Sequence, residues 1–174
     1  MNNPLGIEYP FSQIRKNHAL EHATLQVLAK NKVPAGRLFG YSGPGGFWLI
    51  GTVSTEALTN AAQEALQRLQ QGETKLAIHP NCGTNLATTG LMAGMAAWVS
   101  MVGVKKGFRS WYNRFPLVLS LVTLAIMISQ PLGPRIQEVV TTDAQVKQLK
   151  IIQVTRYDGK FLPVHRITTW LSEA

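Results

Sequence analysis

Two long runs of apolar residues place the strongest constraint on this chain. Residues 86–104 and residues 115–133 each contain 19 residues without an ionisable side chain. A helix of about 20 apolar residues is long enough to cross the hydrocarbon core of a bilayer, which is about 30 Å thick. Ten residues join the two runs, so a chain that crosses twice must turn back at once. We therefore expect an integral membrane protein with an antiparallel transmembrane helical hairpin.

The residues before the first run predict two amphipathic helices. Apolar side chains recur at helical spacing in residues 11–32 and again in residues 54–71. We expect Ser12 to cap the first helix, and either Ser54 or Thr55 to cap the second, because their short oxygens can accept from the backbone N–H groups of a first turn.

Short apolar runs predict the strands. In the N-terminal part these are residues 47–53 and residues 75–78, and beyond the second long run residues 151–169 are typical of a β-hairpin with a tight turn at Asp158-Gly159. The glycine-rich residues 40–46 fit a turn or a flexible lid better than a phosphate cradle, because they match neither a Walker A loop nor a dinucleotide fingerprint.

The predicted fold is an α+β soluble domain with an antiparallel transmembrane helical hairpin and a C-terminal β-hairpin. We place the soluble domain at residues 1–85, the membrane hairpin at residues 86–133, and the β-rich tail, packed on the N-terminal domain, at residues 134–174. Gly90 and Gly94 have the GxxxG spacing of close helix contacts. That spacing is common, so a contact and a chance match remain open.

The net charge of +8 comes from 17 Lys and Arg against 9 Asp and Glu. The basic residues form no dense run, so attraction to anionic lipid headgroups explains them and nucleic-acid binding is not expected. The N-terminus lacks the pattern of a signal peptide, and we expect the chain to keep Met1. Basic residues in the loop favour a cytoplasmic loop, but translocating a large N-terminal domain without a signal is difficult. We favour both soluble parts on the cytoplasmic side of the membrane.

The first candidate site is His18-Ala-Leu-Glu21-His22, an H-x-x-E-H sequence inside a predicted helix. Residues at i, i+3 and i+4 share one helical face, so both imidazoles and the carboxylate point in similar directions. Two such histidines can bind one Zn²⁺ while the acid serves as a general base, the arrangement of the inverzincin peptidases. The alternative is a solvated face with ordinary surface histidines.

A second motif would complete the coordination of a metal. His79-Pro-Asn-Cys82 supplies an imidazole and a thiol on a predicted turn, and these are ligand types that Zn²⁺ prefers. Three of the four histidines and the single cysteine lie in the two motifs. The alternative is that His79 and Cys82 only pack in the interior. We predict a shared Zn²⁺ site built from His18, His22, His79 and Cys82.

HALEHAT at residues 18–24 and HPNCGTN at residues 79–85 resemble the signatures of an uncharacterised family of two-span membrane proteins found in cyanobacteria and some other bacteria. A second uncharacterised membrane family, typified by the protein called YqhQ, carries a comparable HGAEHK followed by HPRCGTS. The resemblance implies that the two motifs act together in a membrane setting, in the inner or the thylakoid membrane. It implies no substrate.

Three functions are compatible with these motifs. With three protein ligands and Glu21 as general base, the chain would be a membrane-associated zinc hydrolase, with a peptide bond as the first substrate to test. With four ligands the metal would be structural, in a scaffold or assembly factor for a membrane complex; the cyanobacterial resemblance suggests a photosynthetic one. The third is a tetrapyrrole carrier that uses His18 or His22 as axial ligand. In inverzincins the third ligand is a glutamate on a downstream helix; Glu56 and Glu64 could supply it here, but we favour the His79–Cys82 turn.

Two further expectations concern polar residues outside the motifs. Asn17 or Asn85 could orient a metal ligand from behind. His165, in the predicted C-terminal hairpin, is expected on the surface.

Overall fold

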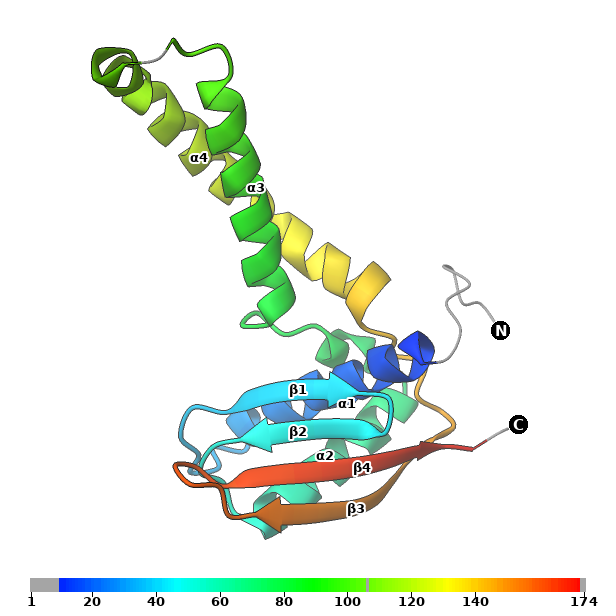
Figure 1. Ribbon diagram of the computed structural model, residues 1–174. Coiled ribbons are helices and arrows are strands. Elements are labelled where there is room, and N and C mark those ends of the chain that lie inside the picture. The colour runs from blue at the N-terminus through cyan, green and yellow to red at the C-terminus, as the bar shows by residue number, and fades with distance from the viewer. Residues whose placement is uncertain (1–9, 106, 173–174) are drawn as a thin grey trace. The chain divides into compact units, whose positions relative to one another are not determined.

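The computed structural model describes residues 10–105 and 107–172. The chain divides into two compact units (Figure 1). The first combines residues 10–79 with residues 138–172, and the second is the intervening segment, residues 80–137. The helical unit is therefore an insertion in the sequence of the mixed unit.

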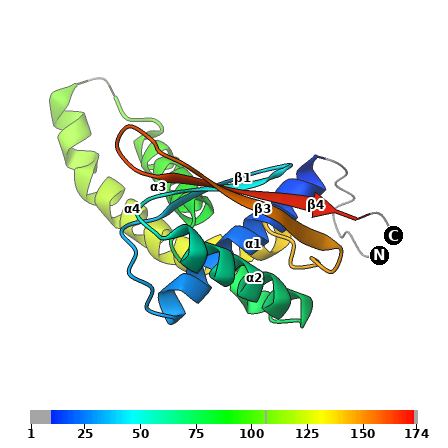
Figure 2. The ribbon, with the colours of Figure 1, turned by 90° about the horizontal axis from the view of Figure 1, so that it is seen from below.

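The mixed unit is built on a four-stranded antiparallel sheet with the strand order β1-β2-β4-β3. Helices α1 and α2 both cover the same face of this sheet (Figures 1 and 2). Every second residue of β2 and β4 points at the helices, so Phe47, Leu49 and Ile167 are fully buried against Leu20 and Leu58. The elements are α1 (Phe11–Lys30), β1 (Phe39–Gly43), β2 (Gly46–Ile50), α2 (Thr55–Gln70), β3 (Leu149–Tyr157) and β4 (Val164–Leu171).

Both amphipathic helices were predicted correctly, but only one of the predicted caps is confirmed. The Ser54 hydroxyl accepts from the N–H of Ala57 at 3.2 Å and caps α2. Pro10 occupies the N-cap position of α1 without a side-chain cap, so the prediction for Ser12 is wrong. A proline there costs little, because the first N–H groups of a helix have no partner inside the helix.

Two short segments differ from the prediction. Residues 75–78 are not a strand: Thr74–Ala77 form the 3-10 helix η1, and apolar runs this short carry too little periodicity to separate the two. For the glycine-rich segment the predicted turn is confirmed and the alternative of a flexible lid is wrong, because the segment forms β1 and its tight turn into β2. Gly46 begins β2 with a φ of 125°, and an added Cβ would meet the carbonyl oxygen of Ile167. Only glycine allows that approach of backbone to backbone.

The C-terminal strands form the predicted hairpin, but the tight Asp158-Gly159 turn is wrong. Tyr157 pairs with Val164, so six residues connect β3 to β4. A two-residue turn at residues 158–159 would place Pro163 inside the ladder, where its missing N–H would cost a hydrogen bond. The longer loop leaves Pro163 just before the first residue of β4.

His165 is completely buried, contrary to the prediction of a surface position. His165 and Ile167 lie two residues apart on β4, so both face the helices. The Nε2 of His165 lies 3.1 Å from the Thr55 hydroxyl. Within the described part of the chain, its Nδ1 has no hydrogen-bond partner. Burial, and then the charge of Arg156, lower the pKa of His165 from its ordinary value of 6.5.

The helical unit contains α3 (Gly83–Met101) and α4 (Phe108–Ile136). Helix α4 continues into a π-helical turn, η2 (Gln137–Thr141), whose residues from Glu138 onward belong to the mixed unit. The helices run antiparallel, because Thr89 contacts Ser129 at 2.9 Å between hydroxyls whereas Asn85 accepts from Gln137 at 2.6 Å. A Cβ added at Gly90 or Gly94 would meet nothing within 4 Å. The GxxxG spacing therefore does not mark the contact between these helices.

One helix among the described residues, Phe108–Thr141, is long and apolar enough to cross a membrane. The second predicted apolar run is helical throughout and the first is helical as far as Met101. Helix α3 does not reach the same standard, since polar residues such as Asn85, Thr88 and Thr89 lie in its first turns. One such helix is weak evidence by itself, because a core helix of a soluble protein can meet the same criterion. One apolar helix does not by itself establish a transmembrane hairpin.

The buried His165 predicts a pH-dependent stability. A lowered pKa in the folded state means that the unfolded chain binds the proton more readily, so stability is complete above about pH 6.5 and falls as the pH falls below it. We expect the melting temperature to drop between about pH 7.5 and about pH 5.5, and to drop less in His165→Gln. Identical pH profiles for the two proteins in thermal denaturation would contradict this role of His165.

Candidate metal centre

His18 and His22 lie one turn apart on α1 and face the same way. Their ring centroids are 4.2 Å apart, and their ligand nitrogens lie within 4.8 Å of each other. Two nitrogens that share one tetrahedral Zn²⁺ at ordinary bond lengths are about 3.3 Å apart. The helical spacing thus brings the two imidazoles close to the separation that a shared metal ion requires.

Each of these imidazoles is oriented by a backbone carbonyl. The Nδ1 of His22 donates to the carbonyl oxygen of Ala77 at 2.7 Å, and the Nδ1 of His18 donates to that of Thr141 at 2.9 Å. A carbonyl oxygen can only accept, so Nδ1 carries a proton and the neutral ring has its lone pair on Nε2. Metal-ligating histidines are typically held in this way.

His79 lies beside His22 at the end of the mixed unit, with the two ring centroids 5.6 Å apart. It follows η1, whose last residue supplies the carbonyl for His22. In the described residues, however, His79 is not part of a group whose ligand atoms all lie within 4.8 Å of one another. His79 therefore lies close to the pair formed by His18 and His22, which we call the histidine cluster, through its contact with His22.

Cys82 belongs to the helical unit, where it is the N-cap of α3 and its Sγ accepts from the N–H of Thr84 at 3.4 Å. It follows His79 by three residues. An extended chain spans at most about 3.6 Å per residue, so the Cα atoms of the two residues are at most about 11 Å apart.

Glu21 is almost fully buried, and its carboxylate is held at β1. The hydroxyl of Ser42 donates to Oε2 at 2.6 Å. An added Cβ at Gly40 would collide with the Glu21 carboxyl group, so the side chain lies directly against the strand backbone. Sequence reasoning missed both Ser42 and Gly40, because nothing in a glycine-rich segment identifies which distant carboxylate it will contact.

Among the described residues, neither glutamate of α2 belongs to the group of possible metal ligands that contains His18 and His22. Glu64 contacts Asn31 and Arg68, and Glu56 is exposed in the first turn of α2. Asn17 does not orient a ligand: its amide donates to the carbonyl oxygens of Gly43 and Pro44.

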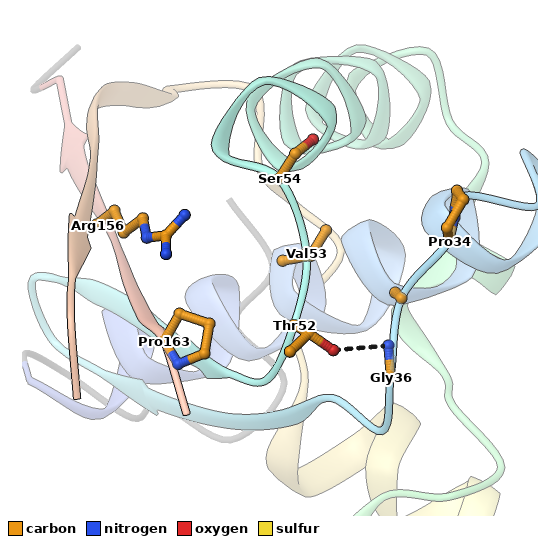
Figure 3. Close-up of a pocket in the computed structure, with 8 residues that line it drawn as sticks. Pro34, Gly36, Thr52, Val53, Ser54, Arg156 and Pro163 are labelled. Atoms are coloured by element: carbon orange, nitrogen blue, oxygen red, sulfur yellow. Dashed lines mark hydrogen bonds between the residues drawn. The ribbon is translucent and has the colours of Figure 1, made fainter. Parts of the chain in front are cut away.

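The mixed unit contains a cavity of about 660 Å³, and none of the predicted site residues lines it. Pro34, Thr52 and Pro163 form part of its wall (Figure 3). The side chain of Arg156 points into the cavity (Figure 3). Its Nε donates to the carboxylate of Asp158 at 3.0 Å. This cavity therefore adds nothing to the histidine cluster.

Comparisons with known proteins identify an uncharacterised family. A family model described as a domain of unknown function (DUF6391) matches residues 13–154. An uncharacterised protein of Picosynechococcus sp. (strain ATCC 27264 / PCC 7002 / PR-6) is 43% identical over 98 residues, which cover 49% of this chain and 48% of that protein. This chain thus spans about half the length of the relative. No solved structure matches the chain. Because the family model covers well over half of its length, the chain belongs to the DUF6391 family.

Proposed function

We propose that this protein binds Zn²⁺ beside a membrane and uses it for hydrolysis. The observation that carries the proposal is the pair of Nδ1 contacts, from His22 to Ala77 and from His18 to Thr141. In the neutral ring this contact puts the lone pair on Nε2, the atom that would bind a metal ion, and the ligand nitrogens of the two imidazoles lie within 4.8 Å of each other. Simple surface histidines would not need this arrangement, and His22 is 2% exposed.

His79 and Cys82 are the proposed further ligands. The contact of His79 with His22 and the short chain between His79 and Cys82 support them. Imidazole and thiolate are the donors that Zn²⁺ prefers, whereas Mg²⁺ and Ca²⁺ require oxygen ligands. The donor set therefore fits zinc better than the hard cations.

Glu21 would supply the acid–base chemistry. A zinc ion would act as a Lewis acid toward a substrate carbonyl. Glu21 follows His18 by three residues on α1, and a glutamate in this position of H-x-x-E-H can accept the proton of an attacking water. Its burial excludes competing solvent, and the Ser42 hydroxyl holds one carboxylate oxygen in a defined position. A peptide bond is the first substrate class to test.

A structural zinc site is the second candidate, and a specific observation favours it. Glu21 is engaged by Ser42 and packed on Gly40, which is also the environment of a carboxylate that only joins α1 to β1. If both His79 and Cys82 bind the ion, four protein ligands close the coordination shell. The metal would then join α1 to the segment that leads into α3, in a scaffold for a membrane complex.

The membrane setting is proposed from the exposure of α3 and α4. Only 11% of the apolar window in helix Phe108–Thr141 is buried, whereas a core helix of a soluble protein is mostly buried. Leu119 on α4 is 57% exposed, and Trp98 on α3 is 72% exposed. Apolar surface of this extent is costly in water and favourable in lipid. We propose that the pair of helices forms the transmembrane hairpin, with the mixed unit on the cytoplasmic side.

Metal analysis tests the site directly. We expect about one zinc per chain in detergent-purified protein and a loss of that zinc in His22→Ala, while His165→Gln, a histidine away from the cluster, keeps it. Retention in Cys82→Ser would favour an open, hydrolytic site, and loss of zinc together with loss of folding in both His22→Ala and Cys82→Ser would favour a closed structural one. Protein that neither contains zinc nor binds added zinc would contradict the proposal. Elemental mass spectrometry supplies the measurement.

Glu21→Gln separates the hydrolytic from the structural use of the metal. The amide can still accept from Ser42, so folding and zinc content should persist, but the general base is lost. We expect hydrolysis in a peptide screen to fall by about 10²–10⁴-fold. Ser42→Ala, which keeps the carboxylate, should fall less. Full complementation of a deletion strain by Glu21→Gln would refute hydrolysis and leave the structural site.

Leu119→Arg tests the membrane hairpin. In lipid, a charge at this position of α4 costs about 2.5–3.5 kcal/mol of insertion free energy near the bilayer centre, whereas on a water-exposed helix it costs almost nothing. We expect a smaller membrane-integrated fraction after alkaline extraction. Phe161→Arg, at a position that is 88% exposed in the β3–β4 loop, is the matched control and should have no effect. Wild-type protein that is released by alkali would contradict the hairpin.

A further inference from the structure

Arg15 is a buried cation that forms no ion pair with any residue the structure describes. It lies on α1, three residues before His18, and is 7% exposed. Its Nη2 donates to the carbonyl oxygens of Val139 at 2.9 Å and Thr142 at 3.0 Å. Its Nε has no hydrogen-bond partner, and no ion pair includes Arg15, among residues 10–105 and 107–172. Buried charges in proteins are ordinarily paired, because desolvation is expensive.

Arg15 lines a pocket of about 300 Å³ in the mixed unit. Two chain segments form most of the rest, residues 74–78 and residues 138–145, and they contribute Lys75 and the hydroxyl-bearing Thr74 and Thr142. A pocket with a buried guanidinium and an ammonium in its wall attracts a ligand with several acceptor oxygens.

Two acidic residues also line this pocket, and neither pairs with Arg15. The carboxylate of Asp143 lies 3.1 Å from the Nζ of Lys16, in an ion pair of its own. Glu138 is exposed and forms no ion pair in the described part of the chain. The charge of Arg15 is therefore left for a ligand.

We propose that the Arg15 pocket binds a phosphate group. The Nε is itself enclosed, so the guanidinium would donate to a phosphate oxygen through Nη1, which the two carbonyl contacts leave unused, and the Lys75 ammonium would neutralise further charge. The site needs no metal, so it stands apart from the proposed zinc site.

Two sources could supply the phosphate. The segments that line the pocket lead directly into and out of the helical unit, since residue 78 is two positions before that unit and residue 138 one position after it. If α3 and α4 cross the bilayer, which rests on the proposed function, only a few residues of chain join these segments to the membrane-spanning helices, and a lipid headgroup could supply the phosphate. The same pocket could otherwise take free inorganic phosphate.

Titration of the full-length protein with inorganic phosphate tests the proposal. The protein is kept in detergent and treated with a chelator, so that no metal competes for the anion, and binding is followed by calorimetry. We expect saturable binding that weakens by about tenfold or more in Arg15→Gln, because a charge-assisted hydrogen bond is lost. It should also weaken in Lys75→Gln. Arg37→Gln, which removes an exposed charge outside the pocket, should bind as the wild type does.

The source is identified in nanodiscs. Weaker phosphate binding in phosphatidylglycerol discs than in phosphatidylcholine discs, in the wild type but not in Arg15→Gln, would indicate a lipid headgroup. Equal affinity in the two discs would indicate free phosphate.

Two outcomes would overturn the proposal that the pocket binds phosphate. The first is that the wild type shows no saturable phosphate binding in detergent or in either disc. The second is that Arg15→Gln binds phosphate with the same affinity as the wild type. If Arg15→Gln loses its helical circular dichroism, Lys75→Gln decides, and unchanged affinity there overturns the proposal. Failure of the proposed zinc site would be a separate result. Zinc binding is judged from the metal content of the wild type and His22→Ala, whereas phosphate binding is measured after the metal has been removed and is expected to persist in His22→Ala.

Discussion

Buried polar side chains on α1 must be hydrogen-bonded, and much of the mixed unit is arranged around that requirement. Arg15, His18 and His22 each donate to backbone carbonyls, in segments that lie more than fifty residues further along the chain. Glu21 accepts from Ser42 on β1, and Asn17 also accepts from Thr169 on β4. One helix thereby holds the sheet, η1 and the segment after α4. Removing any one of these side chains would leave a buried backbone or side-chain group without its partner.

How much of the fold the sequence could predict depended on the length of each pattern. Both long amphipathic helices and the C-terminal strands carry enough repeats for periodicity to identify them. The four residues of η1 do not, and the pairing of β1 with β2 depends on a close approach at Gly46 that no local pattern specifies. His165 was misplaced for a related reason: the alternation of β4 puts it on one face of the sheet, but which face is covered depends on the position of α2.

The candidate site could likewise be predicted only in part, because local patterns specify some of its features and the tertiary fold determines the others. The shared face of His18 and His22 follows from helical geometry and was readable in advance. Their acceptors were not, because Ala77 and Thr141 contribute backbone carbonyls, which any residue possesses. The environment of Glu21 was also unreadable, since Ser42 and Gly40 meet it through the tertiary fold. Sequence could thus identify candidate side chains, but not the hydrogen-bond partners or the orientation in which the fold holds them.

The insertion of the helical unit has a consequence for biosynthesis. Strand β2 must wait for β4, its hydrogen-bonded neighbour, while more than a hundred residues, including both long helices, leave the ribosome. Until then one side of β2 presents unpaired N–H and C=O groups, which can join a strand of another nascent chain. Both helices of the helical unit are synthesised before β3 and β4. In the proposed membrane setting they can therefore enter the membrane while the sheet of the mixed unit is still incomplete. Ribosome-bound intermediates of this protein are therefore most vulnerable to aggregation in the interval between α4 and β4.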